Sequence, residues 1–502
     1  RPGVCVMNRP SIQNQVRSVD HDESVAGSTR IRHRVLQAGG WALSGFAVEK
    51  GIAVLQLVVL TRLLLPGDFG LMMASAAILL AVQTFSELGL EPAVIAKPDV
   101  SEEDLRVAWT LSIIRGLVLA VGLWGLADVI AIGMQIPELS LFLRVHTVGI
   151  LLQSIQSPQL FILLKKLDLR KRVSFDLSRR VLESCVTIGL AWWWQSAWAL
   201  LGGQLVAFVF GALLSYWIAP CRIGWSLNRA SLLSLWNYGR YQNFTGWFLF
   251  TVMCGGDLVV GRLYGVAALG HYQVAMAIPI MIGIRAMSVI SQISLPTYAM
   301  LQKDRPGAMR ALSLQMGLTG MVIVPSALAT ATLAPYLVPF VFGPAWTAAI
   351  DPLRVLCLFA IAAAFCSVMA AFHCGANHPE LQTKIWAAMC ACYVLMVIPF
   401  TMMWGLVGAA LTITLTFVIG LGLHVRATVQ LLGHEAWPAF GPLRWAGGLA
   451  AIVVLGLLLG YTVPSMSMEH WPAMICGLAG ISVYGWHLWA REYPRLRTLW
   501  SA

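Results

Sequence analysis

The chain has 502 residues, of which 58% are hydrophobic and 11% charged, with a formal net charge of +11 at pH 7. Soluble globular proteins carry about 25% charged residues, so the composition excludes that class and is typical of a polytopic membrane protein. The ten cysteines form no C-x-x-C pair and no cluster with histidine. We therefore expect them to be small apolar fillers, and we expect no metal site and no cofactor.

Residues 1–37 are polar and hold six basic side chains, which predicts a disordered cytoplasmic tail. No secretory signal peptide is visible, and the first apolar span is expected to direct membrane insertion. Because the sequence begins at Arg1, Met7 is a candidate for the true start of translation.

Runs of about 20 mostly apolar residues predict membrane-spanning helices along the rest of the chain. Adjoining spans nearly touch near 193–200 and 404–408, so tight hairpins are expected there. The fourteen predicted spans are 38–63, 68–90, 107–134, 141–164, 177–195, 197–219, 240–263, 266–295, 309–334, 347–372, 383–404, 406–430, 443–463 and 471–490.

The basic residues fix the predicted orientation of these spans. With the amino terminus inside, the alternate loops and tails on the inner side hold 27 of the 34 lysines and arginines, as the positive-inside rule requires. This distribution explains the net charge without a nucleic-acid partner. Both termini are expected in the cytoplasm.

The fold class predicted is all-α, with two pseudo-symmetric six-helix lobes and two extra carboxy-terminal helices. No predicted outer loop is long, which argues against an enzyme working on the outer face. The predicted parts are the tail 1–37, the N-lobe 38–220 (helices 1–6), a cytoplasmic linker 221–239, the C-lobe 240–430 (helices 7–12), helices 13–14 in 431–490, and a cytoplasmic tail 491–502.

An internal repeat supports the two lobes. "TRLLLPGDFGLMMAS" (61–75) aligns with "GRLYGVAALGHYQVA" (261–275), so that Arg62 matches Arg262 and Gly70 matches Gly270. Each copy closes one span and opens the next, and an even number of spans separates them. The copies therefore have the same orientation, as in transporters built from parallel repeats with a cavity between the halves. The alternative interpretation of the arginines is an interfacial anchor.

Glu49 and Lys50 lie near the middle of the first span, where a charge costs about 2.5–3.5 kcal/mol. Neighbouring helical residues are about 100° apart, so we expect these two not to face each other. Glu49 shares a stripe with Ala42, Gly45 and Gln56. Such a stripe faces protein or a hydrated cavity rather than lipid.

Three more charged residues lie within predicted spans and also need an explanation: Arg144 in span four, Asp257 in span seven and Arg285 in span eight. One interpretation is structural ion pairing, for example between Asp257 and Arg262. The other is a positive, hydrated cavity for a phosphate-bearing substrate, with the cations as its ligands. Glu49 and Asp257 are then candidates for proton or sodium coupling, or for holding the cations in place.

The run "EKGIAVLQLVVLTRLLLPGDFGLMMASAAILLAVQTFSELGLEPAVI" resembles the amino-terminal signature of bacterial polysaccharide transporters. These are the Wzx-like oligosaccharide flippases of the multidrug/oligosaccharidyl-lipid/polysaccharide exporter superfamily. "GRLYGVAALGHYQVA" resembles the family's second copy of the hinge. The similarity is strongest over 40–135 and 240–300 and weakens to hydropathy beyond about 310.

The resemblance implies a location in the bacterial inner membrane, alternating access, and export of undecaprenyl-pyrophosphate-linked oligosaccharide for capsule, exopolysaccharide or O-antigen. The pyrophosphate would lie near Lys50, Arg285 and Arg144, an assignment that rests on position and chemistry because no family motif transfers. Expected partners are the lipid-linked oligosaccharide, membrane lipid, and a polysaccharide polymerase with chain-length proteins.

Three alternatives remain open. A lipid II flippase would have a cavity of similar charge. A cation-coupled multidrug exporter would favour a cavity of acids and aromatics, which Glu49 and Asp257 allow but Lys50 and Arg285 oppose. A polysaccharide polymerase or ligase would need a large outer loop.

Overall fold

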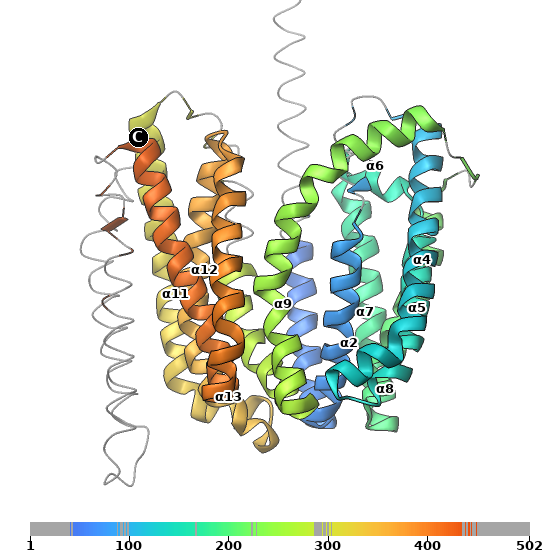
Figure 1. The fold of residues 1–502 in the computed structure, drawn as a ribbon, viewed down its shortest axis with the longest axis horizontal. Helices are drawn as coiled ribbons and strands as arrows, with labels where there is room; N and C mark the ends of the chain where they lie inside the picture. Colours follow the sequence, from blue (N-terminus) through green and yellow to red (C-terminus); the bar gives the residue numbers. More distant parts are fainter. Residues whose placement is uncertain are drawn as a thin grey trace, which may run out of the picture.

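A computed structural model describes residues 44–433, with gaps within 88–99, at 166–167, within 222–227 and within 286–303, and isolated positions elsewhere. This part of the chain folds into helices without a strand (Figure 1). Seven of its helices are long and apolar enough to cross a membrane, and two of these contain a sharp internal turn. The protein is therefore a multi-pass, all-α membrane protein, because helices satisfy their own backbone hydrogen bonds in lipid.

The first half of the chain forms one bundle, on the right in Figure 1. Its first helix occupies residues 44–63. The elements that follow are α2 (Pro66–Phe85), α4 (Glu102–Met134), α5 (Leu139–Ser154), α6 (Gln159–Lys165), α7 (Leu169–Trp194) and α8 (Ala197–Ile218).

The second half forms the bundle on the left in Figure 1, and α9 runs between the two bundles. The elements of the second half are α9 (Arg229–Ile280), the π-helical turn η1 (Met281–Arg285), α11 (Arg305–Val341), the 3-10 turn η2 (Pro344–Ala349), α12 (Ile350–Gly375) and α13 (Pro379–Leu432). Predicted spans thirteen and fourteen lie outside the described residues, as do the tails 1–37 and 491–502.

The tight hairpins predicted near 193–200 and 404–408 are confirmed. Gln195, between α7 and α8, has φ 47°, and Gly405 has φ 58°, where α13 folds back on itself. Gly265 folds α9 back in the same way, with φ 82°. Positive φ angles suit glycine, which carries no Cβ to clash, so two helices can adjoin within one or two residues.

Predicted span four is broken in the structure, where α5 ends at Ser154 and α6 begins at Gln159. Pro158 explains the break, because proline has no N–H and its ring disfavours helix in the residue before it. The exposed backbone is satisfied by α8: Ser157 donates its N–H to Ser215 Oγ at 3.0 Å, and its hydroxyl donates to the carbonyl of Ala219 at 2.6 Å.

Predicted span five is longer than expected, since α7 begins at Leu169 rather than 177. The charged run after 168 was assigned to a loop, but it forms the first two turns of a helix. Asp168 accepts a hydrogen bond from the Lys171 N–H, and Arg172 pairs with Asp176 one turn on at 3.0 Å. An N-cap and an i,i+4 pair of this kind stabilise a helix that hydropathy does not detect.

The two halves meet where the two repeat segments lie against each other. A methyl group built on Gly70 would overlap the carbonyl of Val266, and one built on Gly270 would overlap the carbonyl of Pro66. Val266 is the repeat equivalent of Pro66, so the contact is reciprocal. Only glycine allows two backbones to approach this closely. We call residues 61–70 and 261–270 the two hinges.

Candidate substrate cavity

A cavity of about 380 Å³ lies between the helices of the two halves. The first half contributes residues from the helix 44–63, α2, α7 and α8, and the second half contributes residues from the second part of α9 and from η1. Six of the lining side chains are polar or charged: Lys50, Gln56, Arg180, Glu183, Thr187 and Gln273. The remainder are apolar, including Leu60 next to the first hinge and Phe69 within it.

Lys50 supplies a cation to this cavity. Its Nζ lies 2.6 Å from Glu49 Oε1 and 5.2 Å from the centre of the Phe46 ring. The expectation that Glu49 and Lys50 do not face each other was wrong, because both side chains are long enough to bend together across the 100° between them. The rise per residue places Lys50 about 18 Å along the helix from Arg62.

Arg180 and Glu183 form a second charged group, on α7. Glu183 pairs with Arg180 at 3.0 Å and with Arg179 at 3.9 Å. Ser184, next to it, donates a hydrogen bond to Gln56 Oε1 at 2.9 Å, which ties α7 to the first helix. The sequence analysis placed Arg180 near the start of predicted span five and gave it no part in the site. The spacing Arg172, Asp176, Arg180, Glu183, Thr187 is the periodicity that could have placed it on one helical face.

Asp257 lies just behind the cavity. Its side chain is 7% exposed, and its carboxylate interacts with the Gln273 side chain, which lines the cavity. The neighbouring Gly256 packs against two tyrosines, since a built Cβ would lie 2.9 Å from Tyr393 Oη and 3.3 Å from Tyr272 Oη. Within the described residues no ion pair joins Asp257 to Arg262, whose side chain is exposed.

Arg285 and Arg144, the two arginines predicted to lie near Lys50, differ in their positions relative to the cavity. The backbone of Arg285 ends η1, one turn beyond Met281, which lines the cavity. The side chain of Arg285 lies outside the described part of the structure. Arg144 is absent from the cavity lining; it pairs with Asp128 at 2.6 Å and lies 5.9 Å from the ring centre of Trp124, at the α4–α5 hairpin.

The hinge end of the cavity is closed by contacts between the halves. The Arg62 guanidinium donates to the carbonyls of Phe340 and Val341, in the last turn of α11. Trp346 donates its Nε1–H to the Thr61 carbonyl at 2.9 Å and meets Phe69 edge-on, with ring centres 5.2 Å apart. Carbonyls at helix ends lack helical partners, so these bonds satisfy groups that would otherwise be unpaired. Arg62 is thus a bridge between the halves.

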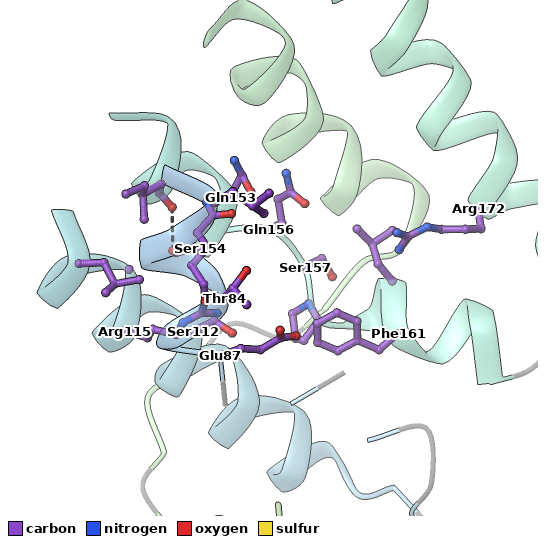
Figure 2. A pocket seen from close by; sticks show the side chains of 17 residues that line it. Thr84, Glu87, Ser112, Arg115, Gln153, Ser154, Gln156, Ser157, Phe161 and Arg172 are labelled. Carbon is purple, nitrogen blue, oxygen red and sulfur yellow. Dashed lines mark hydrogen bonds between the residues drawn. The ribbon is translucent and has the colours of Figure 1, made fainter. Parts of the chain in front are cut away.

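A second cavity, of about 390 Å³, lies inside the first bundle (Figure 2). Its side chains come from α2, α4, α5, the break before α6, α6 itself and α7. Ten of its lining residues carry polar or charged side chains: Gln83, Thr84, Glu87, Ser112, Arg115, Gln153, Ser154, Gln156, Ser157 and Arg172. The sequence analysis did not predict this cavity, because it placed a continuous helix where the break before α6 brings Gln156 next to Arg179 of α7. Among the described residues no cluster of metal-ligand side chains is present.

The sequence profile of a family described as "Polysaccharide biosynthesis protein" matches residues 59–351 of this chain. That match spans both hinges and begins near the end of the helix 44–63, so it includes most of the helices that enclose the cavities. The chain belongs to this family. It is a Wzx-like transporter of polysaccharide biosynthesis, as the resemblance of the first hinge indicated.

Two relatives carry matching sequences. The lipopolysaccharide biosynthesis protein WzxC of Escherichia coli (strain K12) is 22% identical over 332 residues, which cover 65% of this chain and 67% of WzxC. The succinoglycan biosynthesis transport protein ExoT of Rhizobium meliloti (strain 1021) is 22% identical over 322 residues, 64% of this chain and 65% of ExoT. Membership of this transporter family agrees with the prediction that the chain is not an enzyme.

Solved structures show the same fold at low sequence identity. The lipid II flippase MurJ in an inward closed conformation superposes with a TM-score of 0.68 and 11% identity, covering 89% of this chain and 99% of MurJ. An inward-facing multidrug transporter of the MATE family superposes with a TM-score of 0.60 and 15% identity, covering 76% and 95%. The predicted fold class is therefore confirmed, while the count of fourteen helices stays a prediction.

Proposed function

We propose that this family member moves an undecaprenyl-pyrophosphate-linked oligosaccharide across a bacterial inner membrane by alternating access. The observation that carries the proposal is the cavity between the two halves, with Lys50 and Arg180 in its wall and the hinges closed at one end. A charge this deep in a membrane protein marks a substrate or ion pathway by default, because lipid does not solvate it.

The cavity chemistry suits a pyrophosphate. Lysine binds phosphate as a point charge and arginine can bind it with two parallel hydrogen bonds. Lys50 and Arg180 each have one carboxylate partner, Glu49 and Glu183. We infer that these carboxylates hold the cations in place when the cavity is empty and exchange for phosphate oxygens when substrate enters. Arg285, one turn beyond Met281, is proposed as a third cation.

The closed hinges suggest which state this is. If both termini are cytoplasmic, as the basic loops predict, the hinges lie at the outer face and the cavity wall with Lys50 and Arg180 lies on the cytoplasmic side. This geometry supports a state that loads substrate from the cytoplasm. Release would require the contacts of Arg62 and Trp346 to part.

Asp257 is proposed as the coupling site for a sodium ion or proton. Gln273 contacts both the Asp257 carboxylate and the cavity, so a change of charge at Asp257 would reach the substrate through one side chain. The product would pass to a polymerase with chain-length proteins, which are the partners we propose on the outer side.

Reconstituted proteoliposomes test the proposal. A labelled undecaprenyl-pyrophosphate oligosaccharide is incorporated, and its movement between leaflets is measured with and without sodium or proton gradients. Protein-dependent movement that responds to a gradient is expected. Movement of lipid II in its place would favour the lipid II flippase, and uptake of an organic cation with no lipid movement would favour the drug exporter.

A further inference from the structure

The second cavity is a polar chamber inside the first bundle, which spans the membrane. Its volume of about 390 Å³ lies in the range of small-molecule sites, about 300–1,000 Å³. Figure 2 shows Arg115 and Arg172 approaching it from opposite sides, with hydroxyl and amide side chains between them. Polar side chains inside a membrane are costly, so a chamber lined by ten of them implies a polar occupant.

The charged groups of this chamber are already balanced. Arg172 pairs with Asp176 at 3.0 Å, and Arg115 donates to the Gln83 carbonyl at 2.7 Å and to Ser86 Oγ at 3.3 Å. Glu87 adds a carboxylate to the lining. A fully ionised phosphate would therefore meet a carboxylate and two engaged arginines, which makes the chamber a poor anion site compared with the wall around Lys50.

The amides, by contrast, are available. The side-chain amides of Gln83, Gln153 and Gln156 form no hydrogen bond with any of the described residues. A primary amide offers a donor and an acceptor side by side. Sugar hydroxyls present donors and acceptors in the same close spacing, and the Phe161 ring in the same wall offers an apolar surface for the C–H face of a pyranose.

One face of α7 connects the two cavities. Arg172 lines the second cavity, whereas Arg180, Glu183 and Thr187 line the first. Between them, a methyl group built on Gly211 would lie 3.1 Å from Arg179 Cδ and 3.5 Å from Gln156 Nε2, so these two side chains are neighbours. Arg179 in turn pairs with Glu183 at 3.9 Å.

The distance between the two cavities suits one extended ligand. Arg172 and Arg180 are separated by about 12 Å along the helix axis, from a rise of 1.5 Å per residue. A ligand with its pyrophosphate at Lys50 and Arg180 would have to extend by several sugar units to reach Gln156 and Gln153.

We infer that the second cavity is a glycan subsite, which binds sugar units of the substrate through the amides of Gln153 and Gln156 and the Phe161 ring. The inference rests on the proposed function. It adds a division of labour: the first cavity binds the pyrophosphate, and the second cavity binds uncharged, hydroxyl-rich sugar and so contributes to the choice of glycan.

Binding to the purified full chain in detergent tests this with two probes, measured by calorimetry. One probe is the free reducing oligosaccharide released by mild acid from the producing cell's lipid-linked repeat units. The other is undecaprenyl pyrophosphate alone. The variant combines Gln153→Leu with Gln156→Leu, and Gln159→Leu, on α6 outside the chamber lining, is the matched control.

The double variant is expected to bind the oligosaccharide at least tenfold more weakly and undecaprenyl pyrophosphate with unchanged affinity, while Gln159→Leu binds both as the parent does. Unchanged oligosaccharide affinity in the double variant would overturn the subsite, and so would an equal loss of both probes. If the parent chain binds neither probe, the proposed function itself fails and the subsite falls with it.

A second measurement covers the case in which the double variant does not fold. Thr84→Cys, at a lining position that keeps both glutamine amides, is labelled with a maleimide, and the modified peptide is quantified by mass spectrometry so that native cysteines do not interfere. The oligosaccharide is expected to slow labelling at position 84 several-fold, whereas undecaprenyl pyrophosphate does not. Labelling that neither probe slows, or that both slow equally, contradicts the subsite.

Discussion

Gly70 lies directly against the carbonyl of Val266, and Gly270 lies against the carbonyl of Pro66, its repeat equivalent. The two hinges thus pack backbone to backbone, related by the 200-residue offset of the repeat. This contact holds the halves together at one end of the cavity, while Arg62 and Trp346 add side-chain bonds around it. Opening of this end is therefore a concerted separation of both hinges.

The glycine contact predicts the effect of a single methyl group. Gly70→Ala should push the hinges apart, because overpacking of this kind costs about 1–3 kcal/mol. We expect the closed state to lose population and transport to fall severalfold. Accessibility of a cysteine placed at Leu64, a position in the first hinge that is 3% exposed, should rise toward a membrane-impermeant thiol reagent.

Gly67 provides the control for that experiment. It lies in the same hinge, but a methyl group built there would meet only Val266 Cγ2 at 3.9 Å, an ordinary contact distance. Gly67→Ala should leave transport and accessibility close to those of the parent. Equal effects of both substitutions would show that the close approach of Gly70 is not what holds the hinges together.

The indole N–H of Trp346 should stabilise the closed hinge beyond what the apolar contacts of the ring contribute. Trp346→Phe keeps an aromatic ring near Phe69 but leaves the Thr61 carbonyl without its donor, which costs about 1–3 kcal/mol for a buried group. We expect a lower midpoint of thermal unfolding in detergent and weaker closure at the hinge. Thr61→Val is uninformative about the bond because the accepting atom is backbone; Trp386→Phe, away from the hinges, is the matched aromatic control.

Loss of the Lys50 cation should weaken pyrophosphate binding. A charge-assisted hydrogen bond contributes about 1.5–3 kcal/mol, so Lys50→Ala should weaken binding of undecaprenyl pyrophosphate by about ten- to a hundredfold. Arg144→Ala removes a cation of the same membrane protein that lies outside the cavity and should change this affinity little. If Lys50→Ala and Arg285→Ala both leave transport intact, the cationic-cavity hypothesis is wrong.

Neutralising Asp257 should separate coupling from binding. Asp257→Asn preserves the shape of the side chain and its contact with Gln273 but removes the charge that a sodium ion or proton would bind. Transport in proteoliposomes is then expected to lose its dependence on the ion gradient, while affinity for undecaprenyl pyrophosphate stays within about twofold. Asp128→Asn, at the α4–α5 hairpin, is the control carboxylate; gradient dependence that survives in Asp257→Asn would remove Asp257 from the coupling role.

Long apolar runs made the all-α membrane fold predictable from the sequence alone. The bilayer requires about 20 apolar residues for each span and leaves helices as the structure that satisfies their backbones. For the same reason the hairpins at Gln195 and Gly405 could be placed from the few residues between adjoining runs. The family could be predicted from the first hinge because the resemblance lies in the residues of this short segment, "TRLLLPGDFGL", and needs no tertiary structure to be recognised.

Tertiary structure decided which polar groups share a site. Hydropathy gives only the approximate depth of Arg144, Lys50 and Arg180 along their predicted spans. Packing pairs Arg144 with Asp128 and places Arg180 in the wall of the cavity that Lys50 also lines. The helix break at Pro158, which opens the second cavity, depends on α8 to satisfy the freed backbone of Ser157. Contacts between different helices depend on how their faces pack together, and the local pattern of one sequence does not contain that information.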